Sequence, residues 1–172
     1  MMKRISGIHH ITSIVGDAQE NVNFYRDVLG LRLIKKTVNF DDPRVYHLYF
    51  GDKNYLPIDD ISPDVAIKGF AGAVFYSHFP EITAEIMEDF LGFEKLGEEG
   101  EYIRFKSFAD IGNTIDIKTT SSGRGITSLG TVHHIAWRAE DEEDLLEWQS
   151  LARERKFAVG DVRDRKYFKS IY

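Results

Sequence analysis

The spacing of apolar and polar side chains changes along the chain in a way that predicts alternating strands and helices. Alternation over residues 5–15 predicts a first strand. Apolar residues then recur at helical spacing over 17–29, which predicts a helix with Asp17 as its N-cap and Gly30 just past its end. Two strand-like segments follow within 31–50. The chain is therefore expected to open with a strand–helix–strand–strand unit.

The same order of elements recurs in two later parts of the chain. In the second copy, a strand starting at Phe70 leads to a helix that Pro80 opens and Gly92 ends, and three strands follow. In the third copy, a strand starting at Thr131 leads to a helix capped by Asp141, and two more strand-like segments follow. Repetition on this scale predicts an α+β fold of tandem βαβββ modules.

These repeats divide the chain into modules. Residues 1–54 form a first module without a fourth strand, and 55–69 connect it to a second module at 70–120. Residues 131–172 form a last module without its final strand. Both modules are therefore interpreted as incomplete, because an unpaired sheet edge would promote aggregation.

Two histidine pairs occupy equivalent places in the first and last modules. His9–His10 and His133–His134 each lie in the first strand of a module, ahead of its helix. Two imidazoles that converge from separate strands, together with one carboxylate, suit a non-haem Fe(II) centre. Adjacent strand residues point to opposite faces, so one histidine of each pair should bind metal unless the strand bulges, and alternation does not say which. Two matched pairs favour a metal site over ordinary hydrogen-bonded strand histidines.

Other positions carry a weaker signal for a metal site. His47 lies in a strand where packing across the sheet is favoured over a place at the site. His78 falls at the strand–helix corner of the second copy and is expected to be exposed. The second copy carries Ala71-Gly72 where the other modules carry histidines, so it is expected to hold no ligand.

The last nine residues, 164–172, combine charged groups and phenols at strand period. A regular strand would place Arg165 and Tyr167 on one face and Phe168 and Tyr172 on the other. Composition alone favours an amphipathic strand with a solvated basic face.

Composition narrows the classes of function. The 172 residues carry a net charge of −6 with basic residues scattered among acids, so no nucleic-acid partner is expected. The absence of cysteine excludes disulfides and zinc–thiolate sites. The N-terminal stretch reaches His9, His10 and Asp17 before any long apolar run, so neither a signal peptide nor a membrane span is expected. The predicted location is the cytoplasm.

Four stretches of sequence carry a family resemblance. They read GIHHITSIVGDAQENVNFYRDVLGLRLIKKTVNFDD, YHLYFGD, HHIAWRAED and DRKYFKSIY. They resemble the bacterial hydroquinone ring-cleaving dioxygenases of the vicinal oxygen chelate superfamily. The resemblance implies the glyoxalase–bleomycin resistance–dioxygenase fold, an Fe(2+) cofactor, and a small aromatic diol and O2 as substrates. It leaves room for a homo-oligomer.

The resemblance also implies roles for individual residues. The family's first metal ligand is the second histidine of the opening pair, which matches His10, and the second ligand matches His134. The third is a glutamate on the strand after the residue matched by Tyr172, and that stretch does not occur in this sequence. Neither does the family's Gly-Pro-Gly-Thr segment, expected after Asn54. The positions that match the family's substrate surroundings are His9, Thr12, Arg165 and Tyr172.

Together these expectations describe an Fe(II)-dependent, extradiol-type dioxygenase that cleaves hydroquinone-like aromatics in detoxification or catabolism. Two alternatives stay open. One is another metal enzyme of the superfamily, such as a glyoxalase or thiol transferase, which iron content and oxygen uptake would distinguish. The other is a metal-free module that sequesters a toxic aromatic, which needs neither bound metal nor paired histidines.

Overall fold

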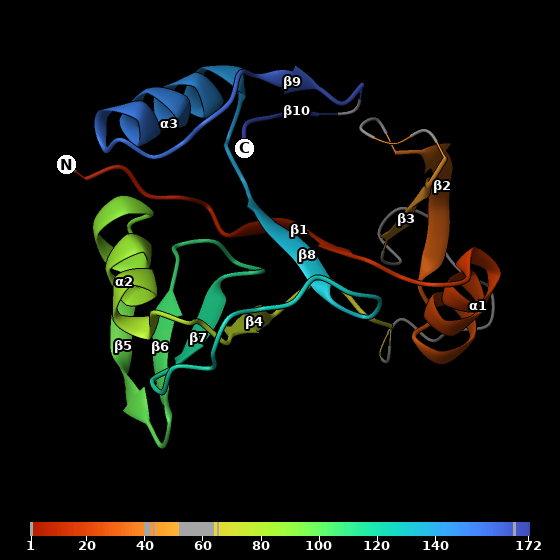
Figure 1. Cartoon of the computed structure of the whole chain (residues 1–172), viewed down its shortest axis with the longest axis horizontal. Helices are drawn as coiled ribbons and strands as arrows, with labels where there is room; N and C mark the ends of the chain where they lie inside the picture. Colours follow the sequence, from red (N-terminus) through yellow and green to blue (C-terminus); the bar gives the residue numbers. More distant parts are fainter. Residues whose placement is uncertain (1, 40–41, 43, 52–63, 65, 167) are drawn as a thin grey trace.

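A two-stranded antiparallel ribbon at the centre of the molecule joins the beginning of the chain to its last third (Figure 1). The computed structural model describes residues 2–39, 42, 44–51, 64, 66–166 and 168–172. The ribbon pairs β1 (Ile8–Ser13) with β8 (Val132–Trp137). These are the predicted first strands of the first and last modules, so the two histidine pairs lie on neighbouring strands.

The elements that follow β1 form a helix and a hairpin, as the sequence predicts. The side chain of Asp17 accepts hydrogen bonds from two backbone N–H groups of the first turn, which confirms the predicted N-cap. Gly30 has φ 64°, the left-handed conformation that ends a helix. Between the two predicted strands, residues 40, 41 and 43 lie outside the described residues, as does the whole segment 52–63. The elements are α1 (Ala18–Asn23), the π-type turn η1 (Phe24–Val28), β2 (Arg32–Val38) and β3 (Tyr46–Gly51).

The second copy of the repeat forms a four-stranded sheet with a helix beside it. The strand order is β4-β7-β6-β5, with β4 and β7 parallel and the other pairs antiparallel. Pro80 is the first residue of its helix, and Gly92 has φ 73°, both as predicted. The elements are β4 (Gly72–Phe75), α2 (Pro80–Glu85), η2 (Ile86–Phe90), β5 (Glu94–Glu99), β6 (Tyr102–Lys106) and β7 (Thr114–Lys118).

The hydrophobic core lies between this sheet, α2, the N-terminal segment and α3 (Glu142–Glu154). Phe105, Ile115 and Ile117 are fully buried, while residues that alternate with them on β6 and β7 form a surface ion pair. Burial of one such side chain contributes roughly 1.5–3 kcal/mol. The cluster comprises Ile5, Ile8, Met87, Leu91, Phe93, Phe105, Ile115, Ile117 and Trp148.

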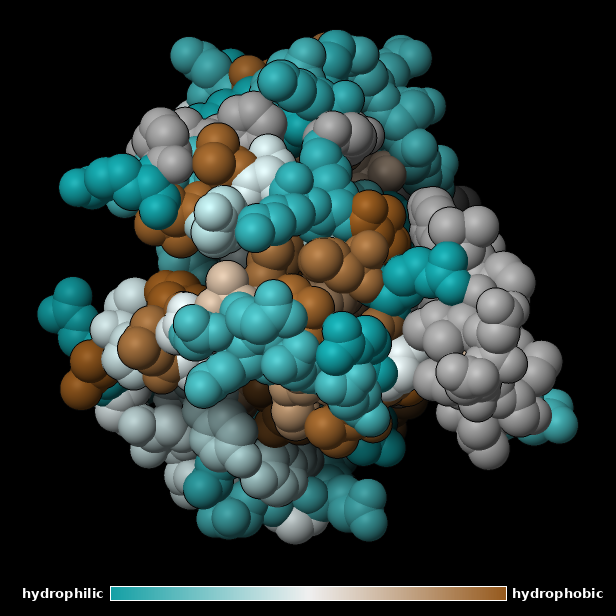
Figure 2. Space-filling model, turned by 90° about the vertical axis from the view of Figure 1, so that its right-hand side faces the viewer, coloured by the Kyte–Doolittle hydropathy of each residue, from teal (hydrophilic) through white to brown (hydrophobic). Residues whose placement is uncertain are grey.

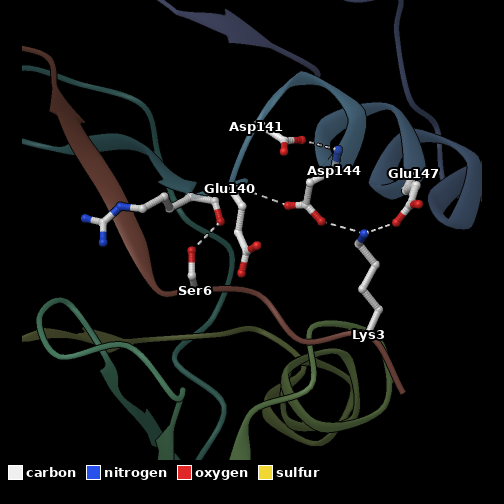
Figure 3. A network of polar contacts seen from close by, with 7 residues as sticks. Lys3, Ser6, Glu140, Asp141, Asp144 and Glu147 are labelled. Carbon is white, nitrogen blue, oxygen red and sulfur yellow. Dashed lines mark hydrogen bonds and ion pairs between the residues drawn. The ribbon is translucent and has the colours of Figure 1, made fainter. Parts of the chain in front are cut away.

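Polar contacts fasten the N-terminal segment to the start of α3 (Figure 3). Asp141 caps α3 as predicted, because its carboxylate accepts a hydrogen bond from the Asp144 backbone N–H at 2.8 Å. The Asp144 carboxylate lies 2.5 Å from the Lys3 ammonium, which also contacts Glu147. These contacts hold the residues leading into β1 against the last helix, and so help to set how β1 meets β8.

The strands predicted over 157–164 and 166–172 are much shorter than expected. Only β9 (Arg163–Asp164) and β10 (Lys169–Ser170) form among the described residues of this region. A turn separates them, in which the Arg165 N–H donates to the Phe168 carbonyl at 3.0 Å and Lys166 has φ 69°. Because the chain reverses here, the regular alternation assumed for 164–172 does not apply. Tyr167, one of the residues assigned a face, lies outside the described residues.

The surface of the α1–β2–β3 unit carries exposed apolar side chains. Figure 2, which views that side of the molecule, shows hydrophobic groups gathered in the middle of the face between hydrophilic margins. Such a patch marks a surface that another segment or molecule can cover, and the expected homo-oligomer stays a prediction. No helix in the described part of the chain has the length and apolar character needed to cross a membrane. The exposed groups of this unit include Phe24, Val28, Ile34 and Val38.

Candidate metal and substrate site

The pairing of β1 with β8 gives the ribbon an approximate local twofold symmetry. Ile11 lies opposite Ile135, while Thr12 lies opposite His134 and His10 opposite Ala136. Directly opposed residues of an antiparallel pair project from the same face. Ile11 and Ile135 pack against the core, so His10, Thr12 and His134 share the other face.

Both strands bulge at the first histidine of each pair. His9 is an extra residue between two paired positions of β1, and His133 is an extra residue in β8. A bulge leaves its extra residue unpaired and redirects nearby side chains. The rings of each pair consequently meet, with Nδ1 of His9 and His10 2.7 Å apart and Nδ1 of His133 and His134 2.8 Å apart. Both histidines of a pair can face one site only where the strand bulges, and both strands bulge.

The geometry of the inner two histidines suits a shared metal ion. Nε2 of His10 lies 3.3 Å from Nε2 of His134. Two imidazole nitrogens bound to one ion at about 2.1 Å, with angles from octahedral to tetrahedral, lie roughly 3.0–3.4 Å apart. When Nε2 binds a metal, Nδ1 keeps its proton and donates it to an outer partner. His9 and His133 lie at that outer position, so they can fix the tautomer and orientation of the two inner rings.

The surroundings keep the inner imidazoles neutral. Burial lowers the pKa of His10 to about 4, and the neighbouring charges of His9, His134 and His47 add to this effect. Burial, followed by the charge of His133, also lowers the pKa of His134. A neutral imidazole has the lone pair that a metal needs, so both rings are in the binding form at neutral pH.

The described residues bring together two imidazoles that can act as metal donors. Within that part of the chain, no group of three or more His, Asp or Glu residues is placed to hold a metal ion. The pair His10–His134 therefore fits two positions of a two-histidine, one-carboxylate centre. The third ligand, a glutamate expected beyond Tyr172, stays a prediction.

Aromatic side chains from the end of the chain cover the histidines. The Phe168 ring lies 5.2 Å from the His9 ring and 5.3 Å from the His10 ring. The Tyr172 ring meets His134 edge-on at 5.5 Å, and the Arg165 guanidinium lies over Tyr172 at 5.3 Å. Arg165 and Tyr172, which regular alternation assigns to opposite faces, come together because of the β9–β10 turn. Four of the site candidates, His9, His10, Thr12 and His134, lie on the ribbon, while Tyr172 contacts His134 and Arg165 contacts Tyr172.

His47 and Tyr49 are residues that sequence reasoning missed or underrated. Their rings stack at 4.4 Å and 24°, and the Tyr49 hydroxyl lies 3.3 Å from Nδ1 of His47. The charge of His47 acts on the pKa values of both His10 and His134, which ties β3 to the same site. The expected packing role for His47 is therefore incomplete. The signal that could have found the pair is the alternation within β3, once one face of that strand is known to meet a helix.

The second copy of the repeat has no space for a ligand at the matching position. A Cβ atom on Gly72 would lie 2.1 Å from the Thr114 carbonyl oxygen, because β4 pairs with the parallel strand β7 at this position. No side chain fits at that distance, which explains why a glycine replaces the histidine. His78 is exposed at the strand–helix corner, as expected, and its backbone carbonyl accepts a hydrogen bond from the Ser121 hydroxyl.

The fold and the β1–β8 ribbon define a class of protein. In this class, βα modules repeat and imidazoles from the first strands of two modules converge. The protein-family model described as "Glyoxalase/Bleomycin resistance protein/Dioxygenase superfamily" matches residues 7–172, and this chain belongs to that superfamily. The predicted fold class and the family resemblance are both confirmed.

Individual relatives carry dioxygenase names. The chain is 38% identical to the Bacillus subtilis protein named "Putative ring-cleaving dioxygenase MhqO" over 255 residues, covering 100% of this chain and 82% of the relative. Since 255 exceeds the 172 residues of this chain, the relative has residues without a counterpart here. A crystal structure of a "putative dioxygenase" from the same species matches at 37% identity and a TM-score of 0.95, covering 99% of this chain and 82% of that one.

A shorter match reaches an enzyme with a named substrate. A stretch of 52 residues is 50% identical to the "Chlorohydroquinone/hydroquinone 1,2-dioxygenase" of Sphingobium indicum. It covers 30% of this chain and 16% of that enzyme.

Proposed function

We propose that this chain forms the metal and substrate site of an Fe(II)-dependent, extradiol-type dioxygenase that cleaves hydroquinone-like aromatics. The main observation behind this proposal is that the Nε2 atoms of His10 and His134 lie 3.3 Å apart across the β1–β8 ribbon. The superfamily match and the names of the relatives support ring cleavage. The shorter match to a hydroquinone dioxygenase supports the substrate class.

The proposed ligands are His10, His134 and a glutamate on a strand beyond Tyr172. These three residues would hold Fe(II) with coordination positions left open, and the bound ion would supply Lewis acidity for a phenol and redox chemistry for O2. His9 and His133 accept hydrogen bonds from the Nδ1–H groups of the two ligands and so keep Nε2 free for the metal. This assignment gives all four ribbon histidines a defined proton state.

The remaining site candidates act on the substrate. Arg165 provides a charge-assisted donor for a phenolate or for the carboxylate that ring opening produces. Tyr172 donates its hydroxyl proton toward oxygen that becomes negative during the reaction. Thr12 lies directly opposite His134 on the same face of the ribbon, so its side chain lies beside that ligand.

The proposal extends to organisation and setting. The modules comprise residues 1–54, 70–120 and 131–172, with 55–69 as the connection. The enzyme acts in the cytoplasm on a small aromatic diol and O2, in detoxification or catabolism, without a nucleic-acid partner.

Oxygen uptake by iron-loaded protein that includes the strand beyond Tyr172 tests the proposal. Methylhydroquinone should drive stoichiometric oxygen consumption with formation of a ring-opened acid, faster than catechol does. Faster cleavage of catechol would overturn the substrate class. Oxygen-independent turnover of a thiol adduct would place the protein among the glyoxalase-like or thiol-transferring members of the superfamily instead.

A further inference from the structure

The hairpin of β2 and β3 presents one of its faces to the helix and carries His47 and Tyr49 on the other. Phe50 stacks on Tyr25 of η1 at 4.5 Å, which marks the helix face of β3. Successive strand residues project to opposite faces, so His47 and Tyr49 lie on the other face. In Figure 1, β3 lies on the side of the hairpin nearer the central ribbon.

That face of β3 shares its electrostatic surroundings with the metal site. The charge of Arg165 acts on both His47 and Tyr49, and Tyr172 acts on Tyr49. On the neighbouring strand, Lys35 lies opposite Tyr49, with its ammonium 5.9 Å from the Tyr49 ring. The groups around His47 are therefore cations and phenols, which suit an oxygen that carries negative charge.

The contact with Tyr49 fits a neutral His47 that carries its proton on Nε2. The Tyr49 hydroxyl lies 3.3 Å from Nδ1, and burial raises the pKa of that phenol, so the hydroxyl stays protonated and can donate. In a neutral imidazole whose Nδ1 accepts, Nε2 carries the hydrogen. His47 can therefore offer an N–H donor from Nε2, and the stacked Tyr49 ring restricts its rotation.

We propose that His47 is a substrate-binding residue that donates to the second hydroxyl of a hydroquinone, and that Tyr49 positions it. This inference rests on the proposed function. A para-diol bound to the metal through one oxygen carries its other oxygen at the opposite end of the ring, away from the metal. An ortho-diol has both oxygens at the metal end and no group to offer β3. The pair on β3 thus selects para-diols over ortho-diols and over simple phenols.

Anaerobic binding of two probes to the iron-loaded protein tests this inference. Hydroquinone and phenol differ only in the second hydroxyl, so the ratio of their dissociation constants reports the contact at that end of the ring. In the parent protein hydroquinone should bind more tightly than phenol. His47→Leu should reduce the ratio by about tenfold, the usual effect of one lost hydrogen bond to a buried polar group. Phenol affinity and iron content should not change.

Further variants separate positioning from packing. His47→Gln, which restores a side-chain N–H, should recover part of the ratio. Tyr49→Phe keeps the stacked ring and removes the hydroxyl, and should reduce the ratio by a smaller factor than His47→Leu. Tyr46→Phe makes the same change at an exposed side chain on the face of β3 that carries Phe50, and should leave the ratio unchanged.

The outcomes distinguish this inference from the proposed function. If the parent prefers hydroquinone and His47→Leu keeps the full preference, the role of His47 is wrong while ring cleavage by the same protein still stands. If the parent shows no preference for hydroquinone, the inference fails even where oxygen uptake confirms a dioxygenase. If the parent neither binds nor cleaves hydroquinone, the proposed function and the inference fall together.

Discussion

His10 and His134 are separated by 124 positions in the sequence, yet their Nε2 atoms lie 3.3 Å apart. Antiparallel pairing of β1 with β8, centred on Ile11 and Ile135, produces this approach. Because side chains alternate along a strand, a slip of one residue in the pairing would turn the histidines toward the core. The site therefore depends on the register of one ribbon.

Removal of either inner imidazole should abolish metal binding. In His10→Ala or His134→Ala protein, two ligands of the proposed triad remain, and they hold Fe(II) too weakly to survive desalting. Iron content should fall to a small fraction of the parent value, and hydroquinone turnover should be lost. Metal analysis after gel filtration measures the iron content, and oxygen uptake measures the turnover.

His78→Ala provides the matched control for these variants. His78 is exposed at a strand–helix corner in a different part of the chain, so the same substitution should change neither iron content nor turnover. Full metal content in His134→Ala would show that the assignment of that ligand is wrong.

Acid should destabilise the metal-free protein through His10. Its folded-state pKa of about 4 lies below the ordinary value of 6.5. Between these values the unfolded chain binds more protons, so the free energy of unfolding falls as the pH falls. His10→Gln removes this titration, and its stability should decline less steeply from pH 6.5 to 4. Denaturant unfolding in the presence of a chelator measures both slopes, and identical slopes would contradict the burial of His10.

A side chain at Gly72 should strain the β4–β7 contact. Gly72→Ala places a Cβ 2.1 Å from the Thr114 carbonyl oxygen, and overpacking of this kind costs about 1–3 kcal/mol. Gly125→Ala is the control, because nothing lies within 4 Å of a Cβ there. Its effect should stay within about 0.5 kcal/mol. Equal stability of the two variants in denaturant unfolding would refute the close approach.

Loss of the Tyr172 hydroxyl should slow turnover without loss of iron. Tyr172→Phe keeps the ring against His134 and removes only the donor, so a decrease of about 10²-fold is expected if the hydroxyl stabilises charge in the transition state. Tyr46→Phe is matched in exposure, with 57% of Tyr46 and 53% of Tyr172 accessible, and should turn over like the parent. Unchanged turnover in Tyr172→Phe would reduce the residue to a packing role.

The sequence predicts the elements of the ribbon, but which histidines meet depends on bulges. Repetition of apolar-His-His-Ile identifies β1 and β8 as equivalent strands, and the structure pairs them. Strict alternation leaves the choice within each pair open. The extra residues His9 and His133 resolve it, and a bulge depends on how two distant strands pair, which local sequence does not encode.

The caps and the end of the chain show the same division between local and long-range information. Asp17 and Asp141 cap their helices as predicted, because a cap depends on neighbours within one turn. The contact between Arg165 and Tyr172 was not predicted, because a turn interrupts the strand on which the alternation argument relied. The sequence favours a packing role for His47 because nothing local shows which face of β3 meets the helix.

The position of iron in crystals of the iron-loaded protein tests the central claim most directly. Anomalous diffraction at the iron edge should give one peak within about 2.1 Å of Nε2 in both His10 and His134. A peak that contacts only one of these histidines, or lies away from the β1–β8 ribbon, would contradict the account.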